Sequence, residues 1–289
     1  MTHTRRVSHV GWAIGVLLAV ASLVGCGNPP YPRGAVESLF EPAQRPVIAT
    51  VHAGGRVLNT ARVDHAATPM AANRPALLFV HGSPGDWKAW APYLKAPELA
   101  EFSTRIAVDR PGFGGSRAGG VMPHLREQAA LLTALIPPGK KAIVVGHSLG
   151  GPLAAWMAID APDRVCAAVS IAGSLSSKHE APRWYNQMAD LGLLTWAIPA
   201  ELIQSNHEMM PLATELVALE SALGKLRVPL VLMQGGKDSL VDPATTDEVV
   251  RRSPAAWLTV QRLPLESHFV LWEKPEVVIQ TILGVPCAS

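Results

Sequence analysis

The sequence predicts an α/β fold in which helices cover both faces of a mostly parallel sheet. Two observations support this prediction. From about residue 76 onward, short apolar or β-branched runs alternate with longer helical patterns, as expected of consecutive β-α-β units. Several of the short runs are apolar on both faces, which is typical of strands buried on both sides in a parallel sheet.

The elements follow in order along the chain. The predicted strands are Ala76–Val80, Arg105–Val108, Ala142–Val145, Val165–Ile171, Pro229–Met233 and Leu258–Arg262. The predicted helices are Trp87–Leu94, Leu125–Ile136, Leu149–Ile159 and Pro275–Leu283. We expect one folded domain over residues 46–289, since roughly 245 residues are within the size of a single α/β domain.

The composition excludes several classes of protein. Hydrophobic residues make up 48% of the chain and charged residues 17%, which excludes intrinsic disorder. Lys and Arg number 25 against 23 Asp and Glu. This balance lacks the basic excess of a nucleic-acid-binding protein. Cys26, Cys166 and Cys287 form no CxxC or Cys/His cluster, which excludes zinc and iron–sulfur sites. We expect no metal and no cofactor. Cys166 falls in a predicted buried strand, so we expect a core thiol and no disulfide.

The N-terminal segment has the pattern of a secretory signal. Arg5 and Arg6 precede an apolar stretch over residues 10–24, which is shorter than a membrane-spanning helix. Its ending, LVGC, resembles a bacterial lipobox, which implies cleavage after residue 25 and a lipid on Cys26. The alternatives are an uncleaved anchor and an ordinary signal peptide. We expect residues 26–45 to be a tether, and the protein to be extracytoplasmic and lipid-anchored. Because Gly27 is not acidic, the outer membrane is favoured over the inner one.

A candidate nucleophile follows the third predicted strand. The segment GHSLGG at residues 146–151 is a G-x-S-x-G motif between a strand and a helix, the context of a nucleophile elbow. The glycines two residues before and after the serine avoid side-chain clashes in this sharp turn. Ser148 is therefore the candidate nucleophile. The amide of Leu149, at the start of a helix, is a candidate donor to an oxyanion.

A second oxyanion donor is expected in the loop after the first predicted strand. That loop reads HGSPGDW at residues 81–87. The N–H of Ser83 is the candidate donor, because Pro84 has none. We interpret His81 as a residue that pins the loop. The segment DRPGFGGS at residues 109–116 lacks the Lys-Ser/Thr of a phosphate-binding loop, so we interpret it as a support for the site.

A serine nucleophile needs a base, and the base needs an orienting acid. Asp238 follows the fifth predicted strand by one short turn and is preferred to Asp242, which is expected to cap the next helix. His268 follows the sixth predicted strand and is the candidate base. His147 lies inside the elbow, where we expect its side chain to point away. His207 is expected on the surface.

The motifs together resemble one family. From about residue 45 to the C-terminus the chain resembles the α/β-hydrolase superfamily, since HGSPGDW, DRPGFGGS, GHSLGG, GGKDSLVD and ESHFVLWEKPEVV occur in that family's order. Dehalogenases and epoxide hydrolases of the family share a similar HGSPG loop but use aspartate as nucleophile. Prolyl aminopeptidases also share the loop, but a bulkier residue typically follows their serine.

The resemblance implies a Ser-Asp-His triad of Ser148, Asp238 and His268, with the amides of Ser83 and Leu149 as the oxyanion hole. The favoured function is hydrolysis of carboxylic esters of small or lipid-like apolar substrates. One alternative keeps the triad but cleaves amide, peptide, thioester or carbon–carbon bonds. Another is a non-catalytic, lipid-anchored binding protein.

A helical cap is expected at about residues 174–225. More than 50 residues separate the fourth and fifth predicted strands, far more than a loop of an α/β unit needs. The segment is amphipathic, and three prolines are expected to break it into short helices: Pro182, Pro199 and Pro211. In the family a segment at this place usually covers the serine. Trp184, Trp196 and Met209 are therefore candidate substrate contacts, and packing of the cap on the domain is the alternative role for such residues.

Overall fold

The protein is built around an eight-stranded sheet, in the strand order β1-β2-β4-β3-β5-β6-β7-β8. The computed structural model describes residues 39–64, 74–102, 104–191 and 198–287. The strands are β1 (Val47–Ala53), β2 (Arg56–Asp64), β3 (Ala76–Val80), β4 (Thr104–Val108), β5 (Ala142–His147), β6 (Val165–Ile171), β7 (Leu230–Gly235) and β8 (Leu258–Leu263). Strands β3 to β8 pair in parallel. Strand β2 is antiparallel to both of its neighbours, β1 and β4. The predicted mostly parallel sheet is confirmed.

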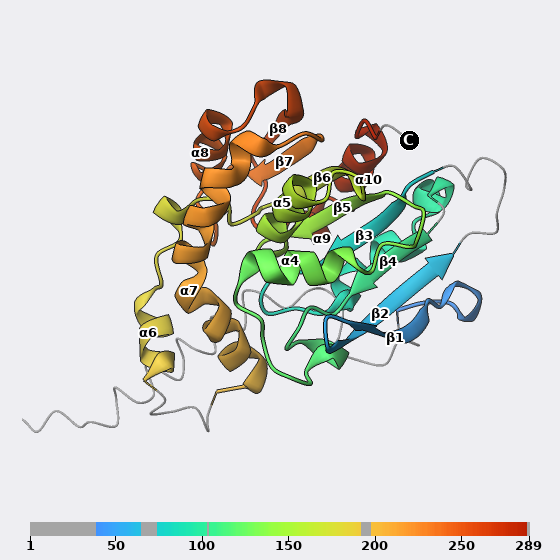
Figure 1. Ribbon diagram of the computed structural model, residues 1–289, viewed down its shortest axis with the longest axis horizontal. Helices are drawn as coiled ribbons and strands as arrows, with labels where there is room; N and C mark the ends of the chain where they lie inside the picture. The colour runs from blue at the N-terminus through green and yellow to red at the C-terminus, as the bar shows by residue number, and fades with distance from the viewer. Residues whose placement is uncertain (1–38, 65–73, 103, 192–197, 288–289) are drawn as a thin grey trace, which may run out of the picture.

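Helices cover both faces of the sheet (Figure 1). They are α3 (Ala91–Lys95), α4 (Leu125–Thr133), α5 (Gly150–Asp160), α6 (Trp184–Asp190), α7 (Ala200–Ala222), α8 (Thr245–Arg252), α9 (Val270–Glu273) and α10 (Pro275–Gly284). One apolar cluster packs α4, α5, α7 and α8 against the sheet, and a second packs α3, α9 and α10 against it. Strands β3, β5 and β6 are therefore buried along their whole length, which explains their apolar sequences.

The hairpin of β1 and β2 is the part of the sheet that the sequence analysis missed. The two strands are joined by Gly54 and Gly55, whose φ angles are 51° and 75°. Two residues with positive φ are typical of the tight turn of a β-hairpin. The Gly54–Gly55 pair could therefore have predicted this hairpin from the sequence. Strand β1 lies at the sheet edge and is mostly exposed.

The packed domain begins earlier than the predicted tether allows. Leu39 and Phe40 are buried, and the Phe40 ring lies 6.2 Å from that of Trp87. The chain is therefore already part of the core at residue 39. The predicted signal segment and Cys26 lie outside the described residues. Within the described residues, no helix combines the length and the apolar character needed to cross a membrane.

The predicted cap contains one short helix, α6, and one helix, α7, that begins after Pro199 as expected but is much longer than expected. Helices α6 and α7 stand beside the carboxyl ends of the parallel strands (Figure 1), and α7 runs for 23 residues straight through Pro211. The prediction that Pro211 ends a helix is wrong. Proline removes one backbone hydrogen bond from a helix, but Leu212, Leu216 and Leu219 are buried in the core on the same helix. Their tertiary packing offsets that loss.

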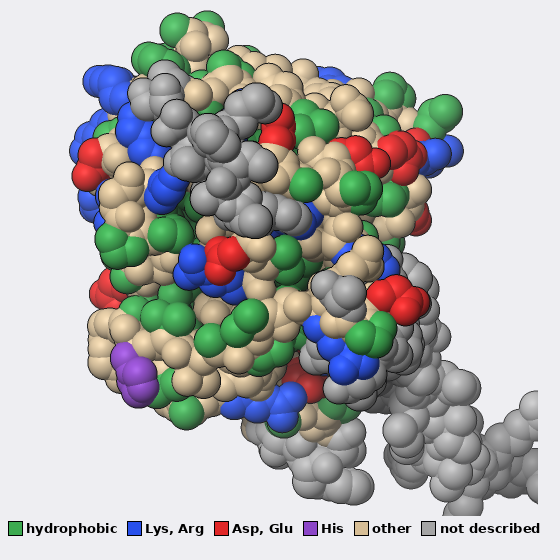
Figure 2. Space-filling model, turned by 90° about the vertical axis from the view of Figure 1, so that its right-hand side faces the viewer, with side chains coloured by type: hydrophobic (Ala, Val, Ile, Leu, Met, Phe, Trp, Pro, Cys, Tyr) green, Lys and Arg blue, Asp and Glu red, His purple; other side chains and the backbone are tan. Residues whose placement is uncertain are grey.

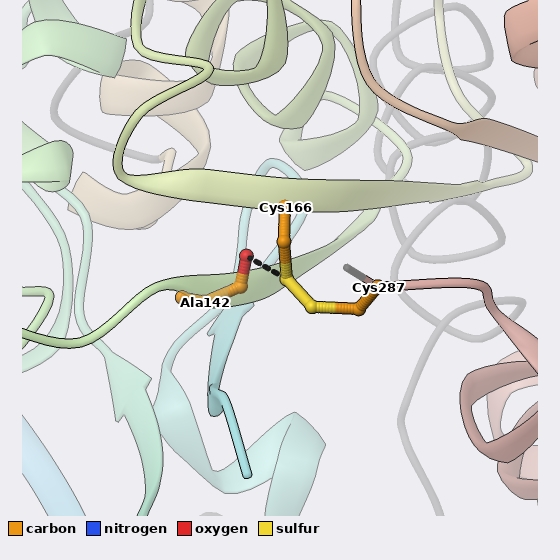
Figure 3. Close-up of a disulfide and its surroundings, with 3 residues drawn as sticks. All are labelled: Ala142, Cys166 and Cys287. Atoms are coloured by element: carbon orange, nitrogen blue, oxygen red, sulfur yellow. Dashed lines mark hydrogen bonds between the residues drawn. A yellow bond between two sulfur atoms is a disulfide. The ribbon is translucent and has the colours of Figure 1, made fainter. Parts of the chain in front are cut away.

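The expectation of a free thiol at position 166 is also wrong. Cys166, at the amino end of β6, forms a disulfide with Cys287, which follows α10 (Figure 3). The two Cα atoms are 5.1 Å apart, a usual separation for a disulfide. The Cys166 Sγ atom also lies 3.4 Å from the carbonyl oxygen of Ala142. Helix α10 packs on the same face of the sheet as Cys166, and this packing brings together two cysteines that lie 121 residues apart in the sequence.

One face of the molecule, shown in Figure 2, carries charged side chains of both signs. On that face, Lys and Arg side chains are interspersed with Asp, Glu and apolar ones, and neither sign of charge forms a continuous patch there.

Candidate active site

The turn between β5 and α5 has the geometry of a nucleophile elbow. Ser148 has a φ of 53°, a strained conformation for a residue with a side chain. A Cβ atom on Gly146 would lie 2.0 Å from the carbonyl oxygen of Gly150, and one on Gly150 would lie 2.3 Å from that of Val80. Only glycine fits at both positions. The steric explanation of the G-x-S-x-G motif is therefore confirmed.

Main-chain hydrogen bonds hold the serine in this turn. The Ser148 N–H donates to the carbonyl of Ile171 at 2.9 Å, and the Gly151 N–H donates to the carbonyl of Ser148 at 2.8 Å. Leu149 directly precedes the first residue of α5, where amide N–H groups lack partners inside the helix. Ser148 itself is only half-buried, so the elbow leaves it open to a reactant.

Asp238 occupies the turn after β7 and is held by four hydrogen bonds. Its Oδ1 accepts from the amides of Leu240 at 2.9 Å and Val241 at 2.8 Å, and its Oδ2 accepts from Gln234 Nε2 at 3.0 Å and His268 Nδ1 at 2.8 Å. Burial alone would raise the pKa of Asp238, but the hydrogen bond and charge of His268 and the two amides outweigh it and lower the pKa. The carboxylate is thus held in its charged form.

This contact also determines the proton position on His268. A carboxylate only accepts hydrogen bonds, so the proton of the neutral imidazole lies on Nδ1 and the Nε2 lone pair is free. That tautomer is the one a general base uses toward a serine hydroxyl. His268 is buried, with 5% of its surface exposed, so neighbouring atoms restrict the ring to this orientation.

His147 differs from its expected orientation. Its ring does not point away from the site but lies 4.9 Å from the His268 ring and 5.0 Å from that of Trp272. Burial, and secondly the charge of His268, lower the pKa of His147 to about 3, so the ring is neutral. Its Nε2–H donates to the carbonyl oxygen of His268 at 3.0 Å. The residue preceding the candidate nucleophile therefore binds the backbone of the candidate base.

The loop after β3 lies directly against the elbow. A Cβ atom on Gly82 would be 2.8 Å from the Cβ of Ser148. The His81 Nε2 accepts from the amide of Arg110 at 2.9 Å, so its Nδ1–H donates to the Gly82 carbonyl at 2.7 Å. His81 therefore pins this loop, as predicted. Because the peptide unit is planar and trans, the N–H of Ser83 points in the opposite direction from the pinned Gly82 carbonyl.

The segment 109–116 supports this loop, as predicted. The buried carboxylate of Asp109 accepts from the amides of Trp87 and Gly115, each at 2.7 Å, and from Asn59 Nδ2 at 2.8 Å. These contacts connect the loop after β4 with both the loop after β3 and strand β2. Burial raises the pKa of Asp109, although these hydrogen bonds have the opposite effect on it.

Asp242 and His207, the alternatives to Asp238 and His268, are both exposed. Asp242 is exposed, and its Oδ1 accepts from the amide of Ala244 at 2.9 Å, just before α8. The N-cap residue of α8 is Ala244, with no side-chain cap, so the prediction that Asp242 caps this helix is wrong: its side chain binds the turn before it. His207 is exposed on α7, which confirms its expected place on the surface.

The cap reaches the site through α7. The Ser83 hydroxyl donates to the Ser205 hydroxyl at 3.0 Å. Met209, a candidate substrate contact, is half-buried and packs against the apolar cluster that contains α5. The side chain of Trp184 and the whole of Trp196 lie outside the described residues.

Three residues near the site escaped the sequence analysis. Burial raises the pKa of Glu180 to about 7, and its Oε1 has no hydrogen-bond partner among the described residues. Arg110 and Glu208 form a buried ion pair beside the loop after β3. The glutamates at residues 201, 208 and 215 recur every seven residues, and this spacing could have drawn attention to Glu208. Nothing in the sequence distinguishes Glu180.

Comparison with known proteins agrees with this architecture. Residues 75–197 match the family model of the alpha/beta hydrolase fold. Two curated relatives carry the name dihydrolipoyllysine-residue acetyltransferase component of acetoin cleaving system. The Cupriavidus necator protein is 37% identical over 91 residues, which are 31% of this chain and 24% of that protein. The Pseudomonas putida protein is 28% identical over 84% of this chain and 70% of its own length.

A solved structure supports the fold over most of the chain. A membrane phospholipase A described as a bacterial virulence factor superposes with a TM-score of 0.62 and 19% identity, covering 94% of this chain and 96% of that one. With the sheet order and the strand-to-helix elbow, these findings show that the chain has the alpha/beta hydrolase fold.

Proposed function

We propose that the protein is a serine hydrolase that cleaves carboxylic esters of small or lipid-like apolar substrates. The observation that carries the proposal is the 2.8 Å hydrogen bond between Asp238 and His268. His147, which directly precedes Ser148 in the strained elbow, also binds the backbone carbonyl of His268. The proposal is supported by a serine in a strained elbow, a histidine in the tautomer of a general base and a carboxylate that orients it.

The reaction follows from these groups. His268 Nε2 takes the proton of the Ser148 hydroxyl as Oγ attacks the ester carbonyl. The developing oxyanion accepts hydrogen bonds from the amides of Ser83 and Leu149. His268 then protonates the departing alcohol, which leaves an acyl group on Ser148. Water, activated by the same imidazole, releases the acid and restores the serine.

The apolar character of the substrate is inferred from the cap. We propose that residues 174–225 cover Ser148 and that Trp184, Trp196 and Met209 contact the acyl or alcohol part. Substituting Trp196 by alanine is expected to change the chain-length preference among p-nitrophenyl esters. An equal loss for every ester, with a lower melting temperature, would instead indicate a packing role.

The bond type is tested by a substrate panel. Hydrolysis of p-nitrophenyl esters with little turnover of aminoacyl anilides is expected. Turnover of the anilides at equal or higher kcat/KM would favour an amidase or peptidase with the same triad. Failure to hydrolyse esters, anilides and thioesters would contradict the proposal and favour carbon–carbon cleavage or a non-catalytic binding protein.

The cellular location is a separate proposal. We propose that the mature protein begins at Cys26 and is held on a bacterial membrane by a lipid on that residue, with the outer membrane favoured. The LVGC sequence at residues 23–26 supports this. Cys26→Ser is expected to leave an unprocessed precursor. A mature N-terminus at another residue, without lipid in the intact mass, would contradict it.

A further inference from the structure

Helix α7 carries three glutamates that bind one segment of the domain. Glu201, Glu208 and Glu215 are spaced by seven residues, which is close to two helical turns, so they lie on one face of the helix. Their partners all lie between the end of β4 and the first residue of α4. Arg117 pairs with Glu201 at 2.6 Å, Arg110 pairs with Glu208 at 2.7 Å, and the amide of Leu125 donates to Glu215 at 3.0 Å.

Only the middle contact is buried. The side chains of Arg110 and Glu208 are 0% and 2% exposed, whereas those of Arg117 and Glu201 are 60% and 31% exposed. Arg110 makes two parallel bonds to the carboxylate, Nη1 to Oε1 at 2.7 Å and Nη2 to Oε2 at 2.9 Å. Such a forked pair is strong and directional, while exposed pairs contribute little.

The remaining donors of Arg110 hold the loop after β3. Its Nε donates to the carbonyl of His81 at 2.9 Å, and its Nη2 donates to that of Gly82 at 3.0 Å. Its Nη1 also donates to Gln128 on α4 at 2.9 Å. One guanidinium therefore fixes two successive carbonyls of this loop, and the orientation of the Gly82 carbonyl determines where the N–H of Ser83 points.

We propose that Arg110 and Glu208 are positioning residues for the oxyanion hole, through which α7 of the cap controls the direction of the Ser83 amide. The inference rests on the proposed serine-hydrolase function. Without Glu208, the buried Arg110 cation would lack its counter-charge, which is costly in a site closed to water. The guanidinium would then shift away from the two carbonyls, and the Gly82–Ser83 peptide would lose its fixed orientation.

The test compares Glu208→Gln with two matched controls on the same helix face, Glu201→Gln and Glu215→Gln. Glu208→Gln is expected to lower kcat and kcat/KM for a p-nitrophenyl ester together, by roughly 10- to 100-fold, since loss of one oxyanion donor costs about 100- to 1,000-fold. KM is expected to stay within about twofold, because the lost contact acts in the transition state. The controls are expected to keep kcat within about twofold.

A boronic acid supplies a readout that a purely structural role would not change. It forms a tetrahedral adduct with the serine and places an oxygen in the oxyanion hole, so its affinity is expected to weaken by the same factor as kcat/KM in Glu208→Gln. Unchanged kcat/KM in the folded variant, equal losses in all three glutamine variants, or unchanged boronate affinity would each overturn the proposal.

Arg110→Lys keeps the test decisive if Glu208→Gln does not fold. Lysine retains the charge opposite Glu208, but its single ammonium lacks the fork that binds two carbonyls and a carboxylate at once. The same loss of kcat and boronate affinity is expected, and wild-type values would overturn the proposal. If the unmodified protein neither hydrolyses the ester nor reacts with a fluorophosphonate, the proposed function itself fails, which is a different result from an active enzyme indifferent to Glu208.

Discussion

The carboxyl edge of the sheet and the cap beside it are held by different kinds of contact. At the edge, backbone atoms approach so closely that Gly82, Gly146 and Gly150 have no room for a side chain, and main-chain hydrogen bonds fix Ser148. The cap instead reaches the site through side chains, namely Glu208 on Arg110 and Ser205 on Ser83. The edge is therefore held mainly by close backbone contacts, whereas the cap is held to the site by side-chain contacts.

Removing the proposed catalytic groups at the edge is expected to have the largest effect. Ser148→Ala and His268→Ala should each lower kcat by at least about a thousandfold, because members of a triad act as a unit. Asp238→Asn should also be severe, since it favours the wrong imidazole tautomer. Steady-state hydrolysis of a p-nitrophenyl ester measures these losses. Asp242→Asn is the control, and a damaging Asp242→Asn beside a mild Asp238→Asn would reverse the assignment of the acid.

A single added methyl group tests the steric basis of the edge. Gly146→Ala would bring a Cβ atom to 2.0 Å from a backbone oxygen that cannot move without the elbow. Loss of activity and a lower melting temperature are expected. In Gly284→Ala nothing lies within 4 Å of the new atom, so the free energy of unfolding should change by less than about 1 kcal/mol. Equal behaviour of the two variants would show that close approach at the elbow is not what selects glycine.

These edge features are also the ones that sequence reasoning could predict. Strands β3 and β6 have the predicted ends, and Ser148, Asp238 and His268 each follow a strand within a few residues. A turn glycine and a strand end are encoded in a short stretch of sequence, so they can be recognised there. The β1–β2 hairpin carried the same kind of local signal in its glycine pair.

Features that depend on tertiary packing could not be predicted in this way. Glu208 lies 98 residues from Arg110, and Cys287 lies 121 residues from Cys166. The glutamate spacing on α7 marks one helix face but not its partner, and helices α7 and α10 must pack on the sheet before either pair can form. The same packing carries α7 through Pro211, where local propensity alone indicates a break.

The disulfide lies at the amino end of β6, whereas the elbow lies at the carboxyl ends of the strands. It can therefore be compared with both the edge and the cap. Cys287→Ser is expected to lower the free energy of unfolding by about 2–4 kcal/mol, while kcat stays close to the wild-type value. Urea unfolding of the variant and of the reduced wild-type protein measures the first effect, and ester hydrolysis the second. A fall in kcat of the folded variant would show that the two ends of the sheet are coupled.

The smallest expected effect concerns Glu180, where the chain enters the cap. Burial raises its pKa from 4.5 to about 7. Between these pH values the folded protein keeps a proton that the unfolded chain has lost, so this group makes stability fall as pH rises through the window. Glu180→Gln is expected to flatten the melting temperature between about pH 4.5 and 7. Asp190→Asn, at an exposed site on α6, is the control, and an unchanged slope in Glu180→Gln would contradict this account.

The central claim is that Ser148 is a nucleophile activated by His268, and covalent labelling tests it most directly. The protein is treated with a fluorophosphonate, and intact mass and peptide mapping locate the adduct. One adduct on Ser148 is expected, with no adduct in Ser148→Ala and labelling slowed by at least about a hundredfold in His268→Ala. An adduct on another residue, or wild-type labelling of the folded His268→Ala variant, would contradict the account.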